Sequence, residues 1–274
     1  DMARSFDPLE NKYTDVSKVK GLTVPKITEA TTEDMARNNP RLTRDEMFEF
    51  IFQDLNDAET CLANFTPGAK NIPSLAVVYG LKARAYLWLG GFDEGLYEEV
   101  PTGNAAYAKA AELDVKGSKT KDIKAGLEGI AKKYQEEAYN QYAFTNVKGA
   151  SENFEKAAKA SATAPLSKVD SLNYYNAGFT AWAGADAEKA LEMFNKCYEI
   201  GYYNEDGEVF SKLGEIYLSK KDGDSAVKIL EEGFSKYPQS QSILIGLINY
   251  YIGSKSNTDR LFSLLDEAKK NEPN

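Results

Sequence analysis

The chain has 274 residues and contains no histidine, the side chain that most often acts as a general base, a zinc ligand or the partner of a nucleophile. Carboxylates are plentiful, but the acidic pairs lie among polar neighbours on predicted helices. We interpret them as solvated helix faces rather than paired catalytic acids: Glu98–Glu99, Glu136–Glu137 and Glu231–Glu232. The phosphate-binding patterns GxGxxG and GxxxxGK[ST] are missing. The sequence therefore predicts no enzyme, no catalytic residue and no cofactor.

Metal and disulfide chemistry are equally poorly supported by the sequence. The turns Asn204–Gly207 and Asp222–Asp224 faintly resemble calcium loops, but neither has the required spacing with a closing glutamate. Aspartate and glycine are common in turns for other reasons, so we predict no metal site. The cysteines Cys61 and Cys197 lie far apart, and we expect both to be buried core thiols rather than a disulfide framework.

The amino-acid composition limits the kinds of partner that this chain is expected to bind. The net charge is −9 with a pI near 4.9, which argues against nucleic acid because such a partner favours a basic face. No apolar run approaches the length of a membrane-spanning helix, so we expect no transmembrane segment. The chain begins at Asp1 and contains no signal sequence; we interpret it as a processed form, an engineered form or part of a longer chain.

A helical pattern of about 34 residues is clearest in residues 207–240. Its first helix carries an apolar stripe at helical spacing, made of Phe210, Leu213 and Tyr217. Gly214 has no side chain, so it predicts close approach of a neighbouring helix. Pro238 cannot continue a helix and marks the end of the second one. One such pair cannot bury its stripe alone, so further pairs are required.

Three more copies have the same residue spacing, two before this copy and one after it, so the units start near residues 131, 171, 207 and 241. The last copy needs one extra residue before its second helix. This pattern resembles the tetratricopeptide repeat family over residues 131–274. The resemblance implies an all-α fold, a tetratricopeptide-type α-α superhelix of stacked helical hairpins. It also implies a non-enzymatic scaffold that binds a peptide or protein partner on its concave face.

The first 114 residues have a different organisation. Residues 1–40 lack periodicity and predict an irregular segment that wraps over helices. Residues 41–114 predict a helical segment that opens with a capping box of Thr43 and Glu46. Residues 115–130 predict a linker and the start of the next helix.

Two runs in this part, Arg41–Ala58 and Leu81–Gly90, resemble the SusD/RagB family of outer-membrane lipoproteins. The resemblance covers about residues 1–112 and implies an alternative function: glycan or nutrient binding in the cell envelope of a Bacteroidota bacterium, in the periplasm or at the outer-membrane surface. An oligosaccharide would then contact Trp88, Phe92 and Tyr97, although packing also explains these aromatics. Family members are much longer, so we carry over no glycan-binding residue. The join near 112–115 is a natural rearrangement, an engineered fusion or chimera, or an imperfect sequence assignment, unless the chain is a single native protein with two helical lobes.

The repeat register also predicts a ligand groove. In stacked hairpins the first helices line the concave face, where this chain places an aromatic strip: Tyr139, Tyr142, Tyr175, Phe179 and Trp182. Aromatic side chains grip peptides or stack on sugars. Packing against neighbouring helices is the alternative, which we favour for Tyr142 and Trp182 taken singly. The groove has no clamp of Lys, Arg and Asn for a terminal carboxylate, so a chaperone C-terminus is not the expected partner.

Overall fold

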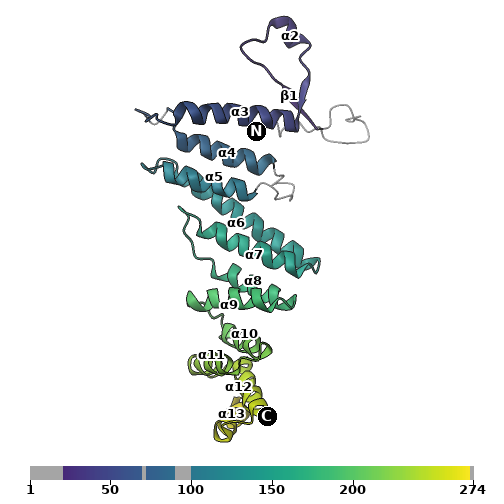
Figure 1. Ribbon diagram of the computed structural model, residues 1–274, viewed down its shortest axis with the longest axis vertical. Helices are drawn as coiled ribbons and strands as arrows, with labels where there is room; N and C mark the ends of the chain where they lie inside the picture. The colour runs from purple at the N-terminus through teal and green to yellow at the C-terminus, as the bar shows by residue number, and fades with distance from the viewer. Residues whose placement is uncertain (1–20, 70–71, 90–99, 272–274) are drawn as a thin grey trace. The chain divides into compact units, whose positions relative to one another are not determined.

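The computed structural model describes residues 21–69, 72–89 and 100–271. The chain divides into two compact units, residues 1–127 and 128–274, and each is described by itself. Figure 1 shows the order of the elements, coloured from the N-terminus to the C-terminus. In both units the regular structure is almost entirely helical, which confirms the predicted all-α class.

The first unit contains a small strand pair and three packed helices. Its elements are β1 (Leu22–Pro25), α2 (Glu33–Arg37), β2 (Arg41–Thr43), α3 (Arg44–Leu62), α4 (Leu75–Leu89) and α5 (Val100–Leu113). β1 and β2 are antiparallel, with Leu22 opposite Thr43. α3 packs against α4, and α4 against α5. The described part of residues 1–40 thus holds a strand and a short helix, where the sequence indicated an irregular segment.

The first long helix begins where the sequence predicts. The Thr43 side chain accepts a hydrogen bond from the backbone N–H of Glu46, and the Glu46 carboxylate accepts one from the backbone N–H of Thr43 at 2.8 Å. This reciprocal capping box satisfies two donors that a helix start otherwise leaves free. Phe52 of α3 and Tyr86 of α4 then join the two helices, with ring centroids 4.5 Å apart.

The second unit is built from stacked helical hairpins. The helices are α6 (Thr120–Ala143) with α7 (Val147–Ala162), α8 (Ser171–Ala183) with α9 (Ala187–Glu199), α10 (Glu208–Ser219) with α11 (Gly223–Lys236), and α12 (Gln241–Ser254) with α13 (Thr258–Asn271). The last three pairs begin at or within one residue of the predicted starts. α6 begins at Thr120, before the expected repeat, and the boundary between the two units falls within it. The tetratricopeptide-type arrangement of successive pairs is therefore confirmed.

The turns inside the pairs share one geometry. In the first three pairs, the middle residue of a three-residue turn has a positive φ of 60–61°: Thr145, Ala185 and Lys221. The next residue caps the following helix through its side chain, which accepts a backbone hydrogen bond three residues on: Asn146, Asp186 and Asp222. The left-handed residue costs about 1–2 kcal/mol, and the cap offsets part of this cost. The sequence signal for each turn is therefore the Asn or Asp cap rather than a glycine.

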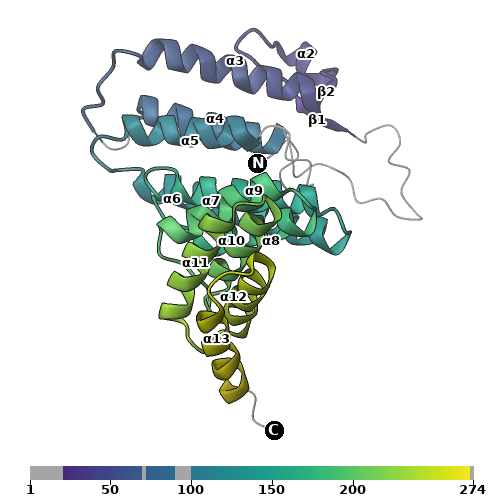
Figure 2. The ribbon, with the colours of Figure 1, turned by 60° about the horizontal axis from the view of Figure 1, so that its bottom comes forward.

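Each pair is completed by the next pair. Phe194 of α9 is fully buried in a cluster with Val209 and Leu213 of α10. Leu230 of α11 is fully buried in a cluster with Ile243 of α12. Figure 2 shows the successive pairs of this unit down to α12 and α13, which pack on each other at its C-terminal end. Because no pair buries its own apolar stripe, stability depends on the junctions between pairs.

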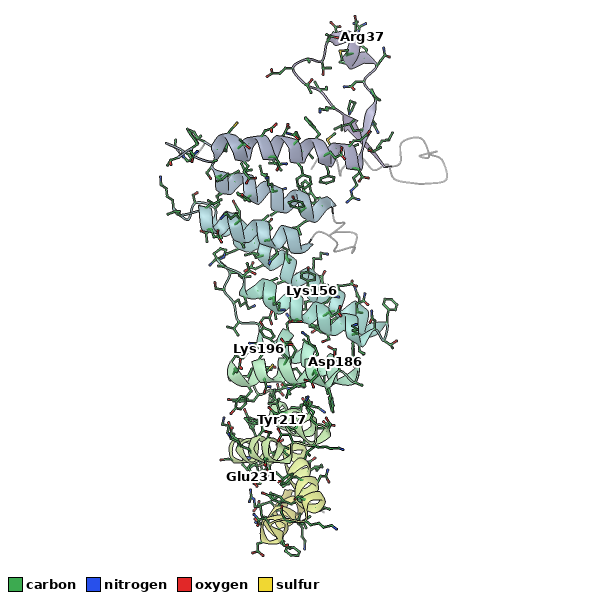
Figure 3. The ribbon with its side chains drawn as sticks, in the orientation of Figure 1. Arg37, Lys156, Asp186, Lys196, Tyr217 and Glu231 are labelled. Atoms are coloured by element: carbon green, nitrogen blue, oxygen red, sulfur yellow. The ribbon has the colours of Figure 1, made fainter. Side chains whose placement is uncertain are left out.

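Polar side chains reinforce the same junctions. Glu231 of α11, labelled in Figure 3, accepts hydrogen bonds at 3.0 Å from Tyr251 of α12 and from Nε of Arg260 of α13. Burial opposes ionisation of Glu231, but these bonds outweigh it and the pKa of the carboxyl is lowered. Tyr198 of α9 likewise donates to Glu232 of α11 at 2.7 Å.

The glycine and proline of the clearest repeat act as predicted. A Cβ atom at Gly214 would lie 2.5 Å from Cγ of Leu230, so only glycine allows α10 and α11 to approach this closely. α11 ends at Lys236, two residues before Pro238.

The prediction for the cysteines is half right. Cys197 is fully buried, and burial raises the pKa of its thiol to about 12. Cys61 is exposed, so the prediction of a core thiol there was wrong. It lies in the last turn of α3, where no other described segment covers it.

Candidate ligand-binding face

Three of the five predicted strip residues lie at the surface of the second unit. Tyr139 and Tyr142 on α6 are 50% and 46% exposed, and Phe179 on α8 is 37% exposed. Trp182 is half-buried against the apolar cluster that joins α8, α9 and α10. Tyr175 is buried. The structure thus separates the strip into surface rings and packing rings.

Tyr175 connects the second pair to the third. Its ring contacts those of Phe194 and Tyr202 edge-on, with centroids 5.9 and 6.1 Å away. Its hydroxyl donates a hydrogen bond to the Glu208 carboxylate at the start of α10. Burial first, and this bond second, raise the pKa of Tyr175 above its ordinary value. Its ring and hydroxyl are therefore engaged inside the fold, because contacts from the following pair reach it.

Two of the surface rings, Tyr139 and Phe179, contact neighbouring side chains. Tyr139 meets Phe154 of α7 edge-on at 5.0 Å, and its hydroxyl lies 3.5 Å from the amide nitrogen of Asn176 on α8. Phe179 stacks at 6.5 Å on the ring of Tyr175. Pre-positioned rings lose little conformational freedom on binding, which favours a recognition role.

Leu172 extends this surface and was missed by the sequence reasoning. It lies seven residues before Phe179 on α8, hence on the same side of the helix, and is 48% exposed. The signal that identifies it is its register position, three residues before Tyr175. We name Tyr139, Tyr142, Leu172 and Phe179 the aromatic face.

Two members of the aromatic face, Tyr139 and Phe179, occupy a position that no pair buries. Tyr139 and Phe179 are equivalent in the repeat register, and their counterparts in the next two pairs are Glu215 and Asn249. All four are exposed. Glu215 is the one charged residue of the four, and Lys212 lies 3.2 Å from its carboxylate. This row of first-helix positions therefore faces solvent in every pair, with little net charge.

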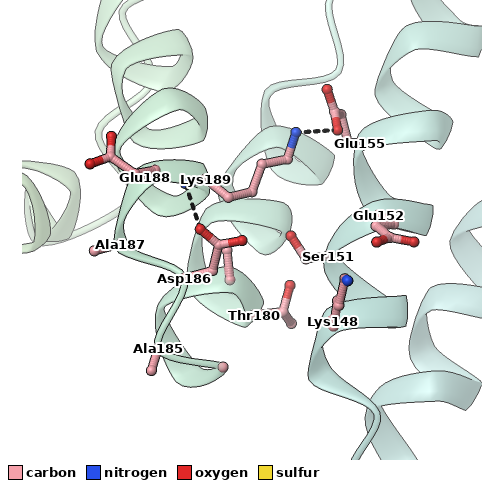
Figure 4. A pocket seen from close by; sticks show the side chains of 12 residues that line it. Lys148, Ser151, Glu152, Glu155, Thr180, Ala185, Asp186, Ala187, Glu188 and Lys189 are labelled. Carbon is pink, nitrogen blue, oxygen red and sulfur yellow. Dashed lines mark hydrogen bonds and ion pairs between the residues drawn. The ribbon is translucent and has the colours of Figure 1, made fainter.

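A hollow of about 740 Å³ lies at the turn edge of the same unit (Figure 4). It is lined by the start of α7, the end of α8 and the start of α9. Its polar side chains are largely used by the fold. Lys189 donates to the buried Glu155, Asp186 caps α9, and Ser151 donates to the Ala177 carbonyl at 2.8 Å. The sequence pattern did not indicate this hollow because residues from three helices form it.

Within residues 21–69, 72–89 and 100–271, no three His, Cys, Asp or Glu side chains gather as a metal site requires. Among the same residues, no helix is both long enough and apolar enough to cross a membrane.

The alternative oligosaccharide contacts are only partly described. Trp88 is half-buried on α4, with the Arg84 guanidinium 5.1 Å from its ring centroid. Phe92 and Tyr97 lie outside the described residues. Only Trp88 of this predicted set thus has a described position, and the set stays a prediction.

No protein-family model matches the sequence, and no curated protein matches it either. Among solved structures the chain is similar to YrrB, described as a tetratricopeptide protein with an unusual peptide-binding site. The identity is 20%, over 73% of this chain and 87% of that one, with a TM-score of 0.40. It is also similar to BtubC from P. vanneervenii (16% identity, 73% and 91% of the two chains, TM-score 0.43). A third similar structure is a kinesin light chain with tetratricopeptide-like repeats from Podosopora anserina. The identity is 16%, over 73% of this chain and 96% of that one, with a TM-score of 0.36. At this level of similarity, the fold assignment rests on the helical hairpins themselves.

Proposed function

We propose that this protein is a non-enzymatic helical-repeat scaffold that binds a peptide or protein partner on the face formed by its first helices. The observation that supports it is the aromatic face: four large apolar side chains, each 37–50% exposed, on two neighbouring first helices. Contiguous exposed apolar patches often mark interaction sites. The register position of Tyr139 and Phe179 is exposed in all four pairs, so the exposure of these two rings belongs to the repeat itself.

The partner is a segment with apolar side chains and no charged anchor. The aromatic face offers large apolar side chains for burial. At the positions equivalent to Phe179 in the next two pairs, the one carboxylate is Glu215, which Lys212 already neutralises. Aromatic contacts provide affinity through buried area, whereas attraction between exposed charges is screened by salt. Binding is therefore expected to depend little on ionic strength.

Selection from a random peptide library tests this proposal. An enriched peptide, measured by fluorescence anisotropy, should lose about 10-fold or more in affinity for a Tyr139→Ala/Phe179→Ala variant. Phe65→Ala is the matched control, since Phe65 is a comparably exposed ring in the first unit. Enrichment of no peptide, or binding that ignores both substitutions, would contradict the proposal.

The alternative function is glycan or nutrient binding in the cell envelope. It is supported by the resemblance of residues 41–90 to SusD/RagB proteins, and the capped helix α3 and helix α4 fall within that stretch. Calorimetric titration with a panel of oligosaccharides tests it: heat of binding that Trp88→Ala removes would favour it, and flat titrations would reject it. Fractionation of the source cell tests the envelope location.

A further inference from the structure

Helix α13, the second helix of the fourth pair, exposes a stripe of residues whose equivalents in the three earlier pairs are covered. Its register positions are Phe262, Leu265 and Lys269, which we name the end stripe. The equivalent positions are Ser151, Phe154 and Ala158 on α7, Leu191, Phe194 and Tyr198 on α9, and Val227, Leu230 and Phe234 on α11. None of these nine is exposed, whereas Phe262 and Leu265 are 61% and 41% exposed.

The earlier stripes are buried because the first helix of the following pair lies on them. Phe194 and Leu191 pack in one cluster with Leu213 of α10. Leu230 packs with Ile243 of α12 in the next cluster. The end stripe is thus the same stacking surface without a cover among the described residues. Two of its three residues, Phe262 and Leu265, are apolar, whereas the outer face of a repeat array that meets water is normally polar.

The charges that flank the stripe are arranged for self-recognition. Asp259 precedes Phe262 by three residues, and Lys269 ends the stripe. Both are exposed, and neither forms an ion pair with another described residue. If two copies of α13 lie antiparallel and cross between Phe262 and Leu265, Asp259 of each copy lies opposite Lys269 of the other. A two-fold axis between identical chains produces this antiparallel arrangement.

We propose that a second copy of this chain covers the end stripe, with the two α13 helices antiparallel across a two-fold axis. The interface continues the stacking of the array: apolar residues of a second helix are buried by a helix from outside the pair. Phe262 and Leu265 supply the apolar centre, and the Asp259–Lys269 pairs at its two ends fix the direction. A different protein with a matching apolar helix is the rival occupant, but the self-complementary order of charges favours a second copy.

Sedimentation equilibrium of the full chain over a wide range of concentration tests the proposal. The wild type should show a reversible monomer–dimer equilibrium. Phe262→Glu and Leu265→Glu should each raise the dimer Kd by about 100-fold, because each buries a charge at the centre of the interface. Both side chains are exposed in the monomer, so the circular dichroism spectrum should not change. Phe144→Glu is the matched control, since Phe144 is 83% exposed on the turn after α6, and it should leave the Kd unchanged.

A charge exchange tests the direction of the helices. Asp259→Lys or Lys269→Asp alone should weaken the dimer, and the double variant should recover most of the loss because both pairs are restored with reversed sign. A wild type that stays monomeric overturns the proposal. A dimer that tolerates Phe262→Glu, or a double variant as weak as its parents, also overturns it.

Discussion

Replacing Gly214 with alanine probes a close contact between α10 and α11. The new Cβ atom would lie 2.5 Å from Cγ of Leu230, and 2.6 and 2.9 Å from its two methyl carbons. Carbon atoms in contact normally lie about 3.5–4.0 Å apart. Leu230 is fully buried, and a Cβ at Gly246 of α12 would already lie 3.0 Å from it, so the side chain has little room to turn away.

Two opposing effects set the size of the change. Overpacking in a filled core costs about 1–3 kcal/mol, whereas replacing glycine by alanine inside a helix gains about 1 kcal/mol. We therefore expect Gly214→Ala to lower the free energy of unfolding by up to about 2 kcal/mol. Gly129→Ala is the matched control, because no atom lies within 4 Å of a Cβ at this position on α6. There the helix propensity acts alone, and the free energy of unfolding should rise by up to about 1 kcal/mol.

Urea unfolding followed by tryptophan fluorescence measures both variants. The chain has two tryptophans, Trp88 in the first unit and Trp182 in the second, so a Trp88→Phe background makes the signal report the second unit. In a further Leu230→Ala background the overlap is absent, and Gly214→Ala should become stabilising. The reasoning fails if Gly214→Ala stabilises the wild type as Gly129→Ala does, or if its cost persists without the Leu230 side chain.

Three further predictions concern single side chains of the described regions. In the native protein Cys61 should react promptly with a thiol reagent and Cys197 should not, since one is exposed and the other fully buried; mass spectrometry of the labelled chain, with a denatured sample as control, decides this. Burial raises the pKa of the Glu155 carboxyl, but hydrogen bonds from Lys159 and Lys189 outweigh burial, so the pKa is lowered from its ordinary value of 4.5. The ionised Glu155 therefore stabilises the fold above pH 4.5, and this stabilisation is lost as the pH falls through the lowered pKa. Glu155→Gln should therefore cost about 1–3 kcal/mol at neutral pH and progressively less in acid, and a pH-independent cost would contradict this. Tyr175→Phe removes the donor to Glu208 and should cost about 1 kcal/mol in thermal unfolding while leaving peptide affinity unchanged.

The helix pairs could be predicted because their signals are local. Phe210, Leu213 and Tyr217 recur at helical spacing whatever surrounds them, and Gly214 marks the close approach that the Leu230 distance confirms. The capping box at Thr43 is equally local, since both of its partners lie within one turn. Such features depend on a few consecutive residues, which a single sequence contains in full.

The division of the aromatic strip could not be predicted from spacing. Tyr175 and Phe179 are both aromatic, lie one turn apart on α8 and project from similar positions. Tyr175 is buried because Tyr202 and Glu208, some 27 and 33 residues later, reach its ring and hydroxyl. The irregular connection before α10 that places those residues has no repeat pattern to indicate its path. The ligand role of the remaining surface rings stays a prediction for the peptide selection to decide.

Leu230 and Leu265 show that the two exposed apolar surfaces of the second unit have different origins. They are the same residue at the same register position, yet one is fully buried and the other 41% exposed. A first helix of the next described pair lies on Leu230, whereas no described element covers Leu265, so the exposure of the end stripe reflects the lack of a described stacking partner rather than the type of residue. Tyr139 and Phe179, by contrast, are followed by covering pairs and remain exposed, as do their polar equivalents Glu215 and Asn249. A stacking partner therefore fits the end stripe, whereas the aromatic face is open to a ligand that does not extend the stack.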